Sequence, residues 1–271
     1  MADMDSMANS MKGKKAIVTG GGTGLGAATA IGLARRGVHL CINYNSSADA
    51  ANEVVAECKK LGVEAFAVKA NVAEDADCRA LVDAATSKFG GLDILVNNAG
   101  ITKFAQHNDL DALDAEDFMR LYKVNVVAVY QMVRAARPHL DKAGGKATVV
   151  NVSSIAGVTG IGSSIAYAST KGALNTMTLS LARALAPNIR VNAVCPGYIA
   201  SGWFTKYQGT QVEDSTAQRV IESTPLRVAS QPEDIAETIL FVAGPESRHV
   251  TGEFIIVDAG MHLGYAPLRA R

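Results

Sequence analysis

Short apolar segments alternate with longer helical patterns along most of this chain, and this alternation limits its possible folds more than any other feature. The strand candidates, rich in β-branched residues and apolar on both faces, are residues 15–19, 38–43, 64–70, 92–96, 147–152, 189–195 and 254–257. The helical patterns are residues 24–36, 46–61, 74–89, 114–140, 165–186 and 232–243. Strands joined by helices predict right-handed crossovers. We therefore expect an α/β fold, with one doubly wound, seven-stranded parallel sheet covered by helices on both faces.

The length and composition favour one large domain. The chain has 271 residues, 48% of them hydrophobic, and α/β folds of this size often form a single core. We expect one domain over residues 13–271. Residues 1–12 are small, polar and methionine-rich, and we expect a disordered extension there. Residues 201–224 form a long connection after the sixth strand, and we expect a substrate lid.

Composition also argues against several functional classes. The formal net charge is zero with no basic stripe, which argues against nucleic acid as a partner. No apolar run approaches the roughly 20 residues of a membrane span. The four cysteines are far apart and form no C-x-x-C, which is typical of reduced thiols in a cytoplasmic protein. The five histidines are scattered, so we expect no metal site.

A glycine-rich run follows the first strand candidate directly. It reads Thr19-Gly20-Gly21-Gly22-Thr23-Gly24-Leu25-Gly26 and opens the first helical pattern. Glycines let the backbone turn tightly and approach a phosphate, and the helix start directs its amides at that anion. Such a run is often only a turn, but its position between strand and helix indicates a dinucleotide-binding (Rossmann) domain.

The end of the second strand bears on the choice of cofactor. NAD sites often place an acid about 20 residues after the glycines, where this chain has Tyr44, Asn45 and Ser46 and no acid before Asp49. Amides and hydroxyls there could receive a 2′-phosphate, which a carboxylate would repel. We therefore expect NADP(H) to be favoured over NAD(H). Alternatively, Asn45 and Ser46 cap the next helix, and both roles are compatible.

Tyr167 and Lys171 lie four residues apart in a helical pattern, so their side chains share one face. A nearby ammonium favours the phenolate, and we expect it to pull the pKa of Tyr167 toward neutrality. Such a tyrosine suits acid–base chemistry at a carbonyl or alcohol. Taken alone, the pair is weak evidence, because Tyr and Lys are common on helix surfaces.

Together these motifs resemble those of the short-chain dehydrogenase/reductase family, over about residues 14–264. The matching segments come in the family's order: Thr19-Gly20-x-x-x-Gly24-x-Gly26, Asn97-Asn98-Ala99-Gly100, Asn125, Ser153-Ser154, Tyr167-x-x-x-Lys171 and Pro196-Gly197. The resemblance implies an NAD(P)(H)-dependent oxidoreductase that interconverts a carbonyl and a secondary alcohol by hydride transfer.

The resemblance also implies a role for each matching catalytic residue. Tyr167 would be the acid or base, and Lys171 would lower its pKa and bind the nicotinamide ribose. Ser154 would hydrogen-bond the substrate oxygen, and Asn125 would hold a water that links Lys171 to solvent. Taken singly, Ser154 could be an ordinary strand-end hydroxyl and Asn125 an amide that satisfies a helix kink.

The cofactor-binding residues that it implies extend over six segments. They are Gly20, Gly22, Thr23, Gly24, Leu25, Gly26, Tyr44, Asn45, Ser46, Asn71, Val72, Asn98, Ala99, Gly100, Tyr167, Lys171, Pro196, Gly197, Ile199 and Ser201. Three depart from the family's usual residues. Ser201 replaces a threonine, Asn71 an aspartate, and Thr23 a residue that is often basic in NADP-dependent members, which weakens the cofactor prediction.

The resemblance does not fix the substrate. It is strongest to β-ketoacyl-carrier-protein reductases and to glucose or carbonyl dehydrogenases. A carrier protein would need a basic docking patch, for which Lys142, Lys146 and Arg183 are the nearby candidates, so a carrier-bound substrate stays open. Trp203, Phe204 and Tyr207 suggest an apolar or flat substrate, or else anchor the lid to the core.

Two further expectations concern partners and activity. Apolar residues cover a wide arc of the helices at 114–140 and 165–186, and relatives pair these helices within a tetramer, so we expect a homotetramer. Deep packing within one subunit would give the same pattern. The alternative to an enzyme is a catalytically silent member that senses nucleotides or acts as a scaffold.

Overall fold

The computed structural model describes residues 11–264, apart from the side chains of Phe204, Thr210 and Glu213. The extension expected over residues 1–12 therefore lies mostly outside the described residues. Met11 lies within them, is only 1% exposed and belongs to the hydrophobic core. The expectation of disorder is thus wrong at Met11, because its side chain is buried against the first helix layer.

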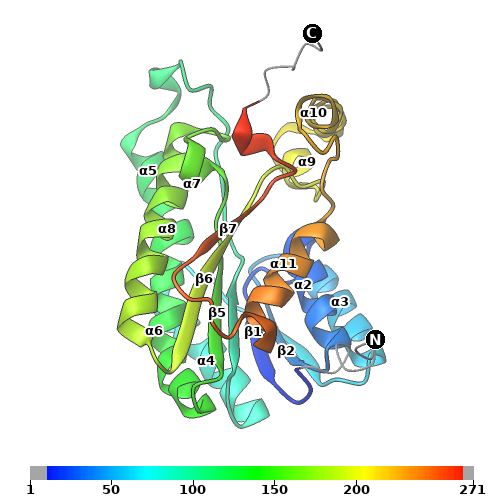
Figure 1. The fold of residues 1–271 in the computed structure, drawn as a ribbon, viewed down its shortest axis with the longest axis vertical. Coiled ribbons are helices and arrows are strands. Elements are labelled where there is room, and N and C mark those ends of the chain that lie inside the picture. The colour runs from blue at the N-terminus through cyan, green and yellow to red at the C-terminus, as the bar shows by residue number, and fades with distance from the viewer. Residues whose placement is uncertain (1–10, 265–271) are drawn as a thin grey trace.

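Seven parallel strands form one sheet, as predicted (Figure 1). They are β1 (Lys15–Val18), β2 (His39–Tyr44), β3 (Ala65–Lys69), β4 (Ile94–Asn97), β5 (Ala147–Val152), β6 (Ile189–Pro196) and β7 (Phe254–Val257). Their order across the sheet is β3-β2-β1-β4-β5-β6-β7. The chain reverses its direction of winding between β1 and β4, and ligands of doubly wound sheets bind at such a switch point.

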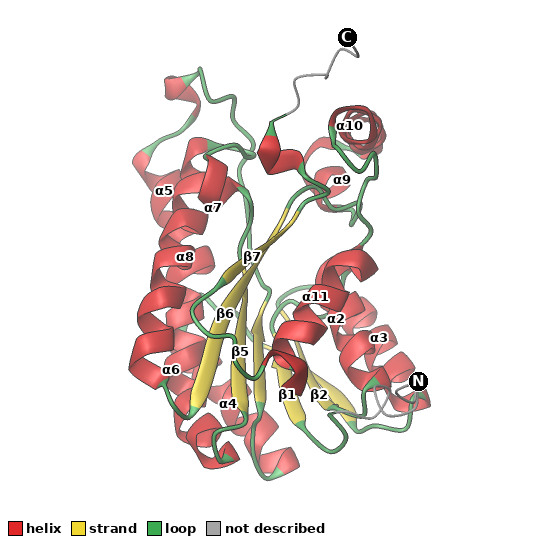
Figure 2. Cartoon of the chain, viewed as in Figure 1, coloured by secondary structure: helices red, strands yellow, loops and turns green. Residues whose placement is uncertain are grey.

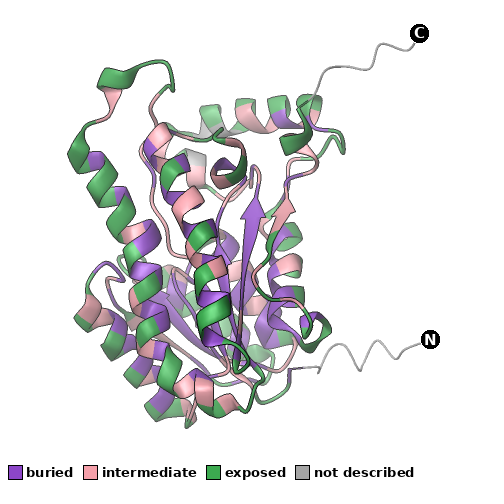
Figure 3. Cartoon of the chain, turned by 60° about the vertical axis from the view of Figure 1, so that its left-hand side comes forward, coloured by how far each residue is buried: buried purple, intermediate pink, exposed green. Residues whose placement is uncertain are grey.

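Side chains alternate across the sheet and enter two separate cores. In β1, Ala16 and Val18 join one core and Ile17 the other. The helices α2 (Gly24–Arg35), α3 (Ala48–Lys60) and α11 (Pro232–Ala243) cover the first face. The helices α4 (Asp75–Phe89), α6 (Ala128–Leu140) and α8 (Ile165–Leu185) cover the second. The sheet is consequently buried on both sides (Figures 1 and 3), which explains why its strands read as continuous apolar runs.

The remaining elements, all short except α10, mostly follow the carboxyl ends of strands (Figure 2). They are the helices α5 (Ala115–Tyr122), α7 (Ala156–Thr159), α9 (Trp203–Gln208) and α10 (Thr210–Ser223), with the turns η1 (Leu110–Ala112), η3 (Asp141–Ala143), η4 (Pro245–Ser247) and η5 (Met261–Leu263). The expected lid over 201–224 thus contains two helices that we did not predict.

The single helix expected over residues 114–140 is interrupted. Asp114 caps α5 in a reciprocal box with Asp117, as its sequence favours. After Tyr122 the chain makes one π-helical turn, η2 (Lys123–Val127), before α6 begins. The wider turn carries Asn125, and π-bulges of this kind are frequent at functional sites.

Candidate active site

The glycine run packs too tightly for side chains. A β-carbon at Gly26 would lie 2.2 Å from the carbonyl oxygen of Gly20, and Gly20 itself has a φ of +61°. The amide of Asn98 holds this turn, because its Nδ2 donates to the carbonyls of Thr19 and Gly20 at 2.9 and 3.1 Å. The Thr19 hydroxyl accepts the backbone N–H groups of Asn98 and Ala99, each at 3.0 Å. The two predicted cofactor segments are therefore braced against each other.

The first turn of α2 fits a diphosphate. It contains no acidic residue, and its N-cap residue Thr23 makes no side-chain capping bond, so the amide end of the helix keeps its partial positive charge. A β-carbon at Gly22 would approach Ala51 to 3.1 Å, and one at Gly24 would approach Ser201 to 3.3 Å. Leu25 and Gly26 are buried behind this turn. The glycines keep the backbone bare where a nicotinamide dinucleotide would lie.

The expected ribose end holds a neutral surface. Asn45 and Ser46 are exposed and Tyr44 is half-buried, whereas Ser47 is the N-cap of α3 and makes no side-chain capping bond. The N-cap position considered for Asn45 and Ser46 is therefore occupied by Ser47, and neither Asn45 nor Ser46 caps α3. Asn43 is buried and braces the fold, since its Oδ1 accepts from Gly20 N at 3.2 Å and its Nδ2 donates to Ala70 O at 2.9 Å.

Sequence reasoning missed a cation beside this surface. The register of β2 and β3 pairs Tyr44 with Lys69, whose side chain is exposed at the end of β3. Residues opposite each other in a parallel pair point to the same face of the sheet. The ammonium of Lys69 lies beside Tyr44 because of the pairing register of β2 and β3. This register cannot be predicted from the sequence, so Lys69 was missed.

The other expected cofactor residues lie along the same edge of the sheet. Asn71 follows β3, and its Oδ1 accepts from Ala73 N at 3.1 Å, while Val72 is buried. Ala99 and Gly100 follow β4 and are half-exposed. A β-carbon at Gly100 would lie 3.4 Å from Asn125 Oδ1 and 3.9 Å from Lys171 Nζ. The adenosine end and the Tyr167–Lys171 end are thus joined by one continuous edge.

Tyr167 and Lys171 lie on the first turns of α8. Ser164 caps this helix and accepts from Tyr167 N at 3.2 Å. The ammonium nitrogen of Lys171 lies 5.6 Å from the centroid of the Tyr167 ring and donates to Val152 O at 2.8 Å. Only 5% of Lys171 is exposed. The pair shares a helix face as predicted, and the carboxyl end of β5 holds its amine.

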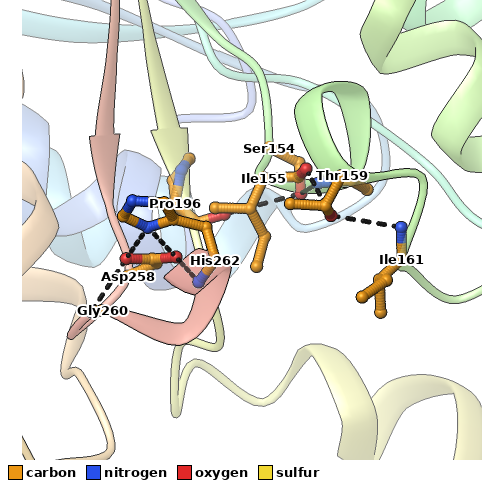
Figure 4. A network of polar contacts seen from close by, with 9 residues as sticks. Ser154, Ile155, Thr159, Ile161, Pro196, Asp258, Gly260 and His262 are labelled. Carbon is orange, nitrogen blue, oxygen red and sulfur yellow. Dashed lines mark hydrogen bonds and ion pairs between the residues drawn. The ribbon is translucent and has the colours of Figure 1, made fainter. Parts of the chain in front are cut away.

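Ser154 follows β5 and meets the Tyr167 phenol in a hydrogen bond. Its hydroxyl accepts from Ala156 N at 3.1 Å and lies 3.5 Å from Pro196 O (Figure 4). The backbone of Ile155 donates to the same Pro196 oxygen at 2.9 Å. These bonds fix the serine loop against the end of β6. The structure therefore brings together three of the four residues expected to be catalytic.

Asn125 completes the set from the π-helical turn and is 1% exposed. Its Oδ1 accepts from Ile101 N at 2.9 Å, and its Nδ2 donates to Ile101 O at 3.0 Å and to Thr170 Oγ1 at 3.1 Å. The amide therefore links the segment after β4 to Thr170 of α8, the residue directly before Lys171. The side chain has a clear bracing role, and the water link implied for it stays a prediction.

The pKa values differ from the expectation. Burial raises the pKa of Tyr167 to about 12, although the Ser154 hydrogen bond opposes the rise. Burial also lowers the pKa of Lys171 to about 8. At the pH where the free Tyr167 phenol would ionise, Lys171 has already lost its proton, so its ammonium does not lower the pKa of Tyr167. The predicted shift of Tyr167 toward neutrality is wrong for this state of the molecule, because desolvation outweighs the neighbouring amine.

The nicotinamide-side residues follow β6. Pro196 is buried, and a β-carbon at Gly197 would lie 2.7 Å from that of Asp258, so glycine is required there. Ile199 pairs with Ser230 in an isolated bridge. The Ser201 hydroxyl lies 3.5 Å from Ile199 O. Because Ser201 also approaches Gly24, the segment after β6 meets the glycine turn at this point.

The Asp258 carboxylate, at the end of β7, binds the ring of His262 (Figure 4). The two carboxylate oxygens lie 3.0 and 2.9 Å from His262 Nδ1, and they accept from the backbone N–H groups of Gly260 and His262. This network fixes the turn after β7 beside Pro196. Among the described residues, no group of three or more His, Cys, Asp or Glu side chains is arranged to hold a metal ion.

Comparisons with known proteins agree with this geometry. The family described as enoyl-(acyl carrier protein) reductase matches residues 20–262. The protein assigned as ketoacyl reductase 2 of the granaticin polyketide synthase of Streptomyces violaceoruber is 40% identical, covering 92% of this chain and 96% of its own.

Solved structures give the same picture. A short-chain dehydrogenase from Burkholderia cenocepacia in complex with NADP is 36% identical, with a TM-score of 0.83, covering 93% of this chain and 99% of its own. A 7α-hydroxysteroid dehydrogenase, in complex with NADH and 7-oxo glycochenodeoxycholic acid, is 33% identical with a TM-score of 0.86, covering 99% and 100%. The fold neighbours thus include structures with either form of the cofactor.

Proposed function

The chain belongs to the short-chain dehydrogenase/reductase family and is an oxidoreductase of that family, and from this premise we propose the roles of its residues. We propose that it reduces a ketone to a secondary alcohol, or performs the reverse oxidation, with Tyr167 as the acid or base. The observation that carries the proposal is the meeting of Ser154, Tyr167 and Lys171 at the carboxyl end of β5.

The bound nicotinamide would supply or accept the hydride. In reduction, the Tyr167 hydroxyl would donate its proton to the carbonyl oxygen of the substrate. The Ser154 hydroxyl, which already meets that phenol, would donate a second hydrogen bond to the same oxygen. Below about pH 8 Lys171 is an ammonium, and it would stabilise the tyrosinate that remains. In oxidation each proton moves in the opposite direction.

We propose that NADP(H) is preferred to NAD(H). Asn45 and Ser46 offer hydrogen-bond donors without a negative charge, and Lys69 adds an ammonium opposite Tyr44. A carboxylate at this position would repel a 2′-phosphate, whereas these groups would attract it. The NADP complex of a 36%-identical relative supports this preference.

We propose that the protein is a homotetramer. Most apolar residues expected at the helix interface are buried within the subunit, among them Val129, Met132 and Leu174. The support comes instead from side chains on α5, η2 and α6 that stay exposed, namely Phe118, Met119, Tyr122, Val127 and Tyr130. Within residues 11–264, no helix is both long and apolar enough to cross a bilayer. We also propose a cytoplasmic location, which the four buried free cysteines support.

A panel of substrates tests the proposed reaction. Purified enzyme with NADPH would be given ketones, a 3-oxoacyl thioester and a 2-enoyl thioester, and the loss of NADPH absorbance would be followed. We expect turnover of carbonyl compounds and none of the carbon–carbon double bond, because in the proposed reaction the hydride and the Tyr167 proton add to the two atoms of one carbonyl group. Turnover of only the enoyl compound would contradict the proposal. Tight NADPH binding without any turnover would favour the silent, nucleotide-sensing alternative.

A further inference from the structure

Two aromatic side chains of α9, the first helix after β6, meet a third from the loop after β4. The ring of Tyr207 lies 5.4 Å from that of Trp203 and 6.0 Å from that of Phe104, between centroids, at interplanar angles of 57° and 52°. We call these three residues the aromatic group. Tilted rings at such distances attract each other through their edges and faces. The group therefore links α9 to the opposite loop.

The aromatic group lies close to the proposed acid. The group joins the connections after β4 and β6, and these two strands lie on either side of β5, whose end carries Ser154. The Tyr207 phenol also contributes to the raised pKa of Tyr167. On another side of Tyr167 lies Gly162, where a β-carbon would approach the ring to 3.5 Å. Because Gly162 has no side chain, that part of the Tyr167 ring stays uncovered. A molecule whose carbonyl meets Tyr167 would therefore have Tyr207 within reach.

The loops around this edge expose large apolar side chains. Leu110, Ile161, Leu226 and Leu263 are 74%, 71%, 69% and 68% exposed, and they lie in the connections that follow β4, β5, β6 and β7. Single exposed apolar side chains are ordinary, but here each of four neighbouring connections has a large one that is mostly exposed. This repetition favours an apolar partner at the carboxyl edge of the sheet.

The charges considered for a carrier protein lie elsewhere. Lys142 and Lys146 precede β5, whereas Ser154 follows it, so about 20 Å of strand separate them from the serine at a rise of about 3.3 Å per residue. Arg183 lies twelve residues beyond Lys171 on α8, about 18 Å along the helix. Nearer the site, Lys103 is paired with Asp117, and Lys206 lies over the Tyr207 ring at 5.4 Å.

Building on the proposed function, we propose that the aromatic group forms a wall of the substrate site and selects flat, apolar ring ketones, or their alcohols, over open-chain acyl thioesters. An aromatic ring in the substrate would meet Tyr207 edge to face, while its ketone reaches Tyr167. Aromatic contacts of this kind add to the burial of area, and we expect a preference of about tenfold for an aromatic over a saturated ring of the same skeleton.

The binding test uses two bicyclic ketones with the same carbon skeleton, 2-tetralone and 2-decalone. Trp203 is the only tryptophan of the chain, so its fluorescence reports on the aromatic group directly. The oxidised cofactor is added so that neither ketone is turned over. We expect 2-tetralone to change the Trp203 emission and to bind about tenfold more tightly than 2-decalone. Equal affinities, or tighter binding of 2-decalone, would overturn the inference.

Variants assign the preference to Tyr207. Tyr207→Leu removes the ring and should abolish the difference between the two ketones, whereas Tyr207→Phe keeps the ring and should retain it. Phe241→Leu, at a phenylalanine on α11 that is 43% exposed, serves as the control and should leave the difference unchanged. If Tyr207→Leu still binds 2-tetralone more tightly than 2-decalone, as the wild type does, the inference fails. If the leucine variant does not fold, Tyr207→Phe can still be measured.

Turnover separates this inference from the proposed function. With NADPH, we expect kcat/KM for 2-tetralone to exceed the values for 2-decalone and for an acetoacetyl thioester by about tenfold. Better turnover of the thioester would overturn the inference and leave the proposed function intact. No turnover of any ketone would overturn the proposed function itself, whereas binding measured through Trp203 would still show whether the site selects flat rings.

Discussion

Lys171 is a buried amine, and its positive charge destabilises the folded state. Its pKa is about 8 in the folded chain against an ordinary value of 10.5, because burial disfavours the ammonium. Between these values the unfolded chain binds the extra proton, so the free energy of unfolding rises with pH over this range. Below about pH 8 both states are protonated and the full cost of the buried charge is present.

We therefore predict a pH-dependent difference between the wild type and Lys171→Met. From about pH 8 to about pH 10, the stability of the wild type should rise by about 2 kcal/mol relative to this variant. Urea unfolding at several pH values measures the difference. Lys142→Met, at an exposed lysine, should show no such trend. Parallel curves for the wild type and Lys171→Met would mean that the amine is not desolvated.

Asn125 is the residue that the sequence explained least well. The resemblance implied a water-holding role, but the structure uses its amide in three hydrogen bonds to Ile101 and Thr170. Asn125→Ala would leave the buried groups of Ile101 without partners, and we predict a loss of about 2–3 kcal/mol in the free energy of unfolding. Asn188→Ala, at an exposed asparagine, is the control. An unchanged stability would show that water replaces the amide at no cost.

At the scale of elements, the repeated strand-and-helix pattern was readable because burial on both faces leaves its mark on every strand. Residues 147–152 and 254–257 are strands as predicted, and 232–243 is a helix. The π-helical turn was not readable, since its sequence from Lys123 to Val127 continues the helical pattern on either side. The helices α9 and α10 were also missed, because α9 is only six residues long and the polar sequence of α10 resembles that of a surface loop.

In the candidate site too, some features could be predicted from the sequence and others could not. The glycine run and the Tyr167–Lys171 pair follow from local sequence, because the first lies at a strand end and the second on one helix face. Ser154 was expected only from the family resemblance. Lys69 depends on the pairing of two strands, and the raised pKa of Tyr167 depends on packing from several elements. Such effects of tertiary structure leave no local pattern.

The ends of β2 and β3 carry the prediction on cofactor choice. Calorimetry should show that NADPH binds more tightly than NADH. Lys69→Gln should lower that preference by about two- to fivefold, as expected for an exposed charge. Lys59→Gln, at an exposed lysine in the last turn of α3, should not alter it. If NADPH binds no more tightly than NADH to the wild type, the roles proposed for Asn45 and Ser46 are wrong.

At the scale of the whole molecule, one surface of α5 and α6 remains apolar after the subunit has folded. Met119 is 71% exposed there, next to the exposed rings of Phe118 and Tyr122. A second copy of the chain would remove this surface from water. The proposed tetramer would therefore depend on side chains outside both hydrophobic cores of the subunit.

We predict that Met119→Asp dissociates the tetramer, because it places a charge in an apolar interface. Sedimentation velocity would show a smaller species. Leu110→Asp changes a side chain that is equally exposed but lies in the loop after β4, and it should leave the assembly intact. A wild-type protein that sediments as a monomer would refute the proposed tetramer directly.

The account depends most on the proton held by Tyr167, and one comparison tests it directly. Tyr167→Phe removes only the hydroxyl, so NADPH affinity should be retained while kcat/KM for ketone reduction falls by about 10²–10⁴. Tyr130→Phe, at an exposed tyrosine of α6, should keep full activity. Ketone reduction by Tyr167→Phe at the wild-type rate would contradict the assigned acid–base role and the mechanism that rests on it.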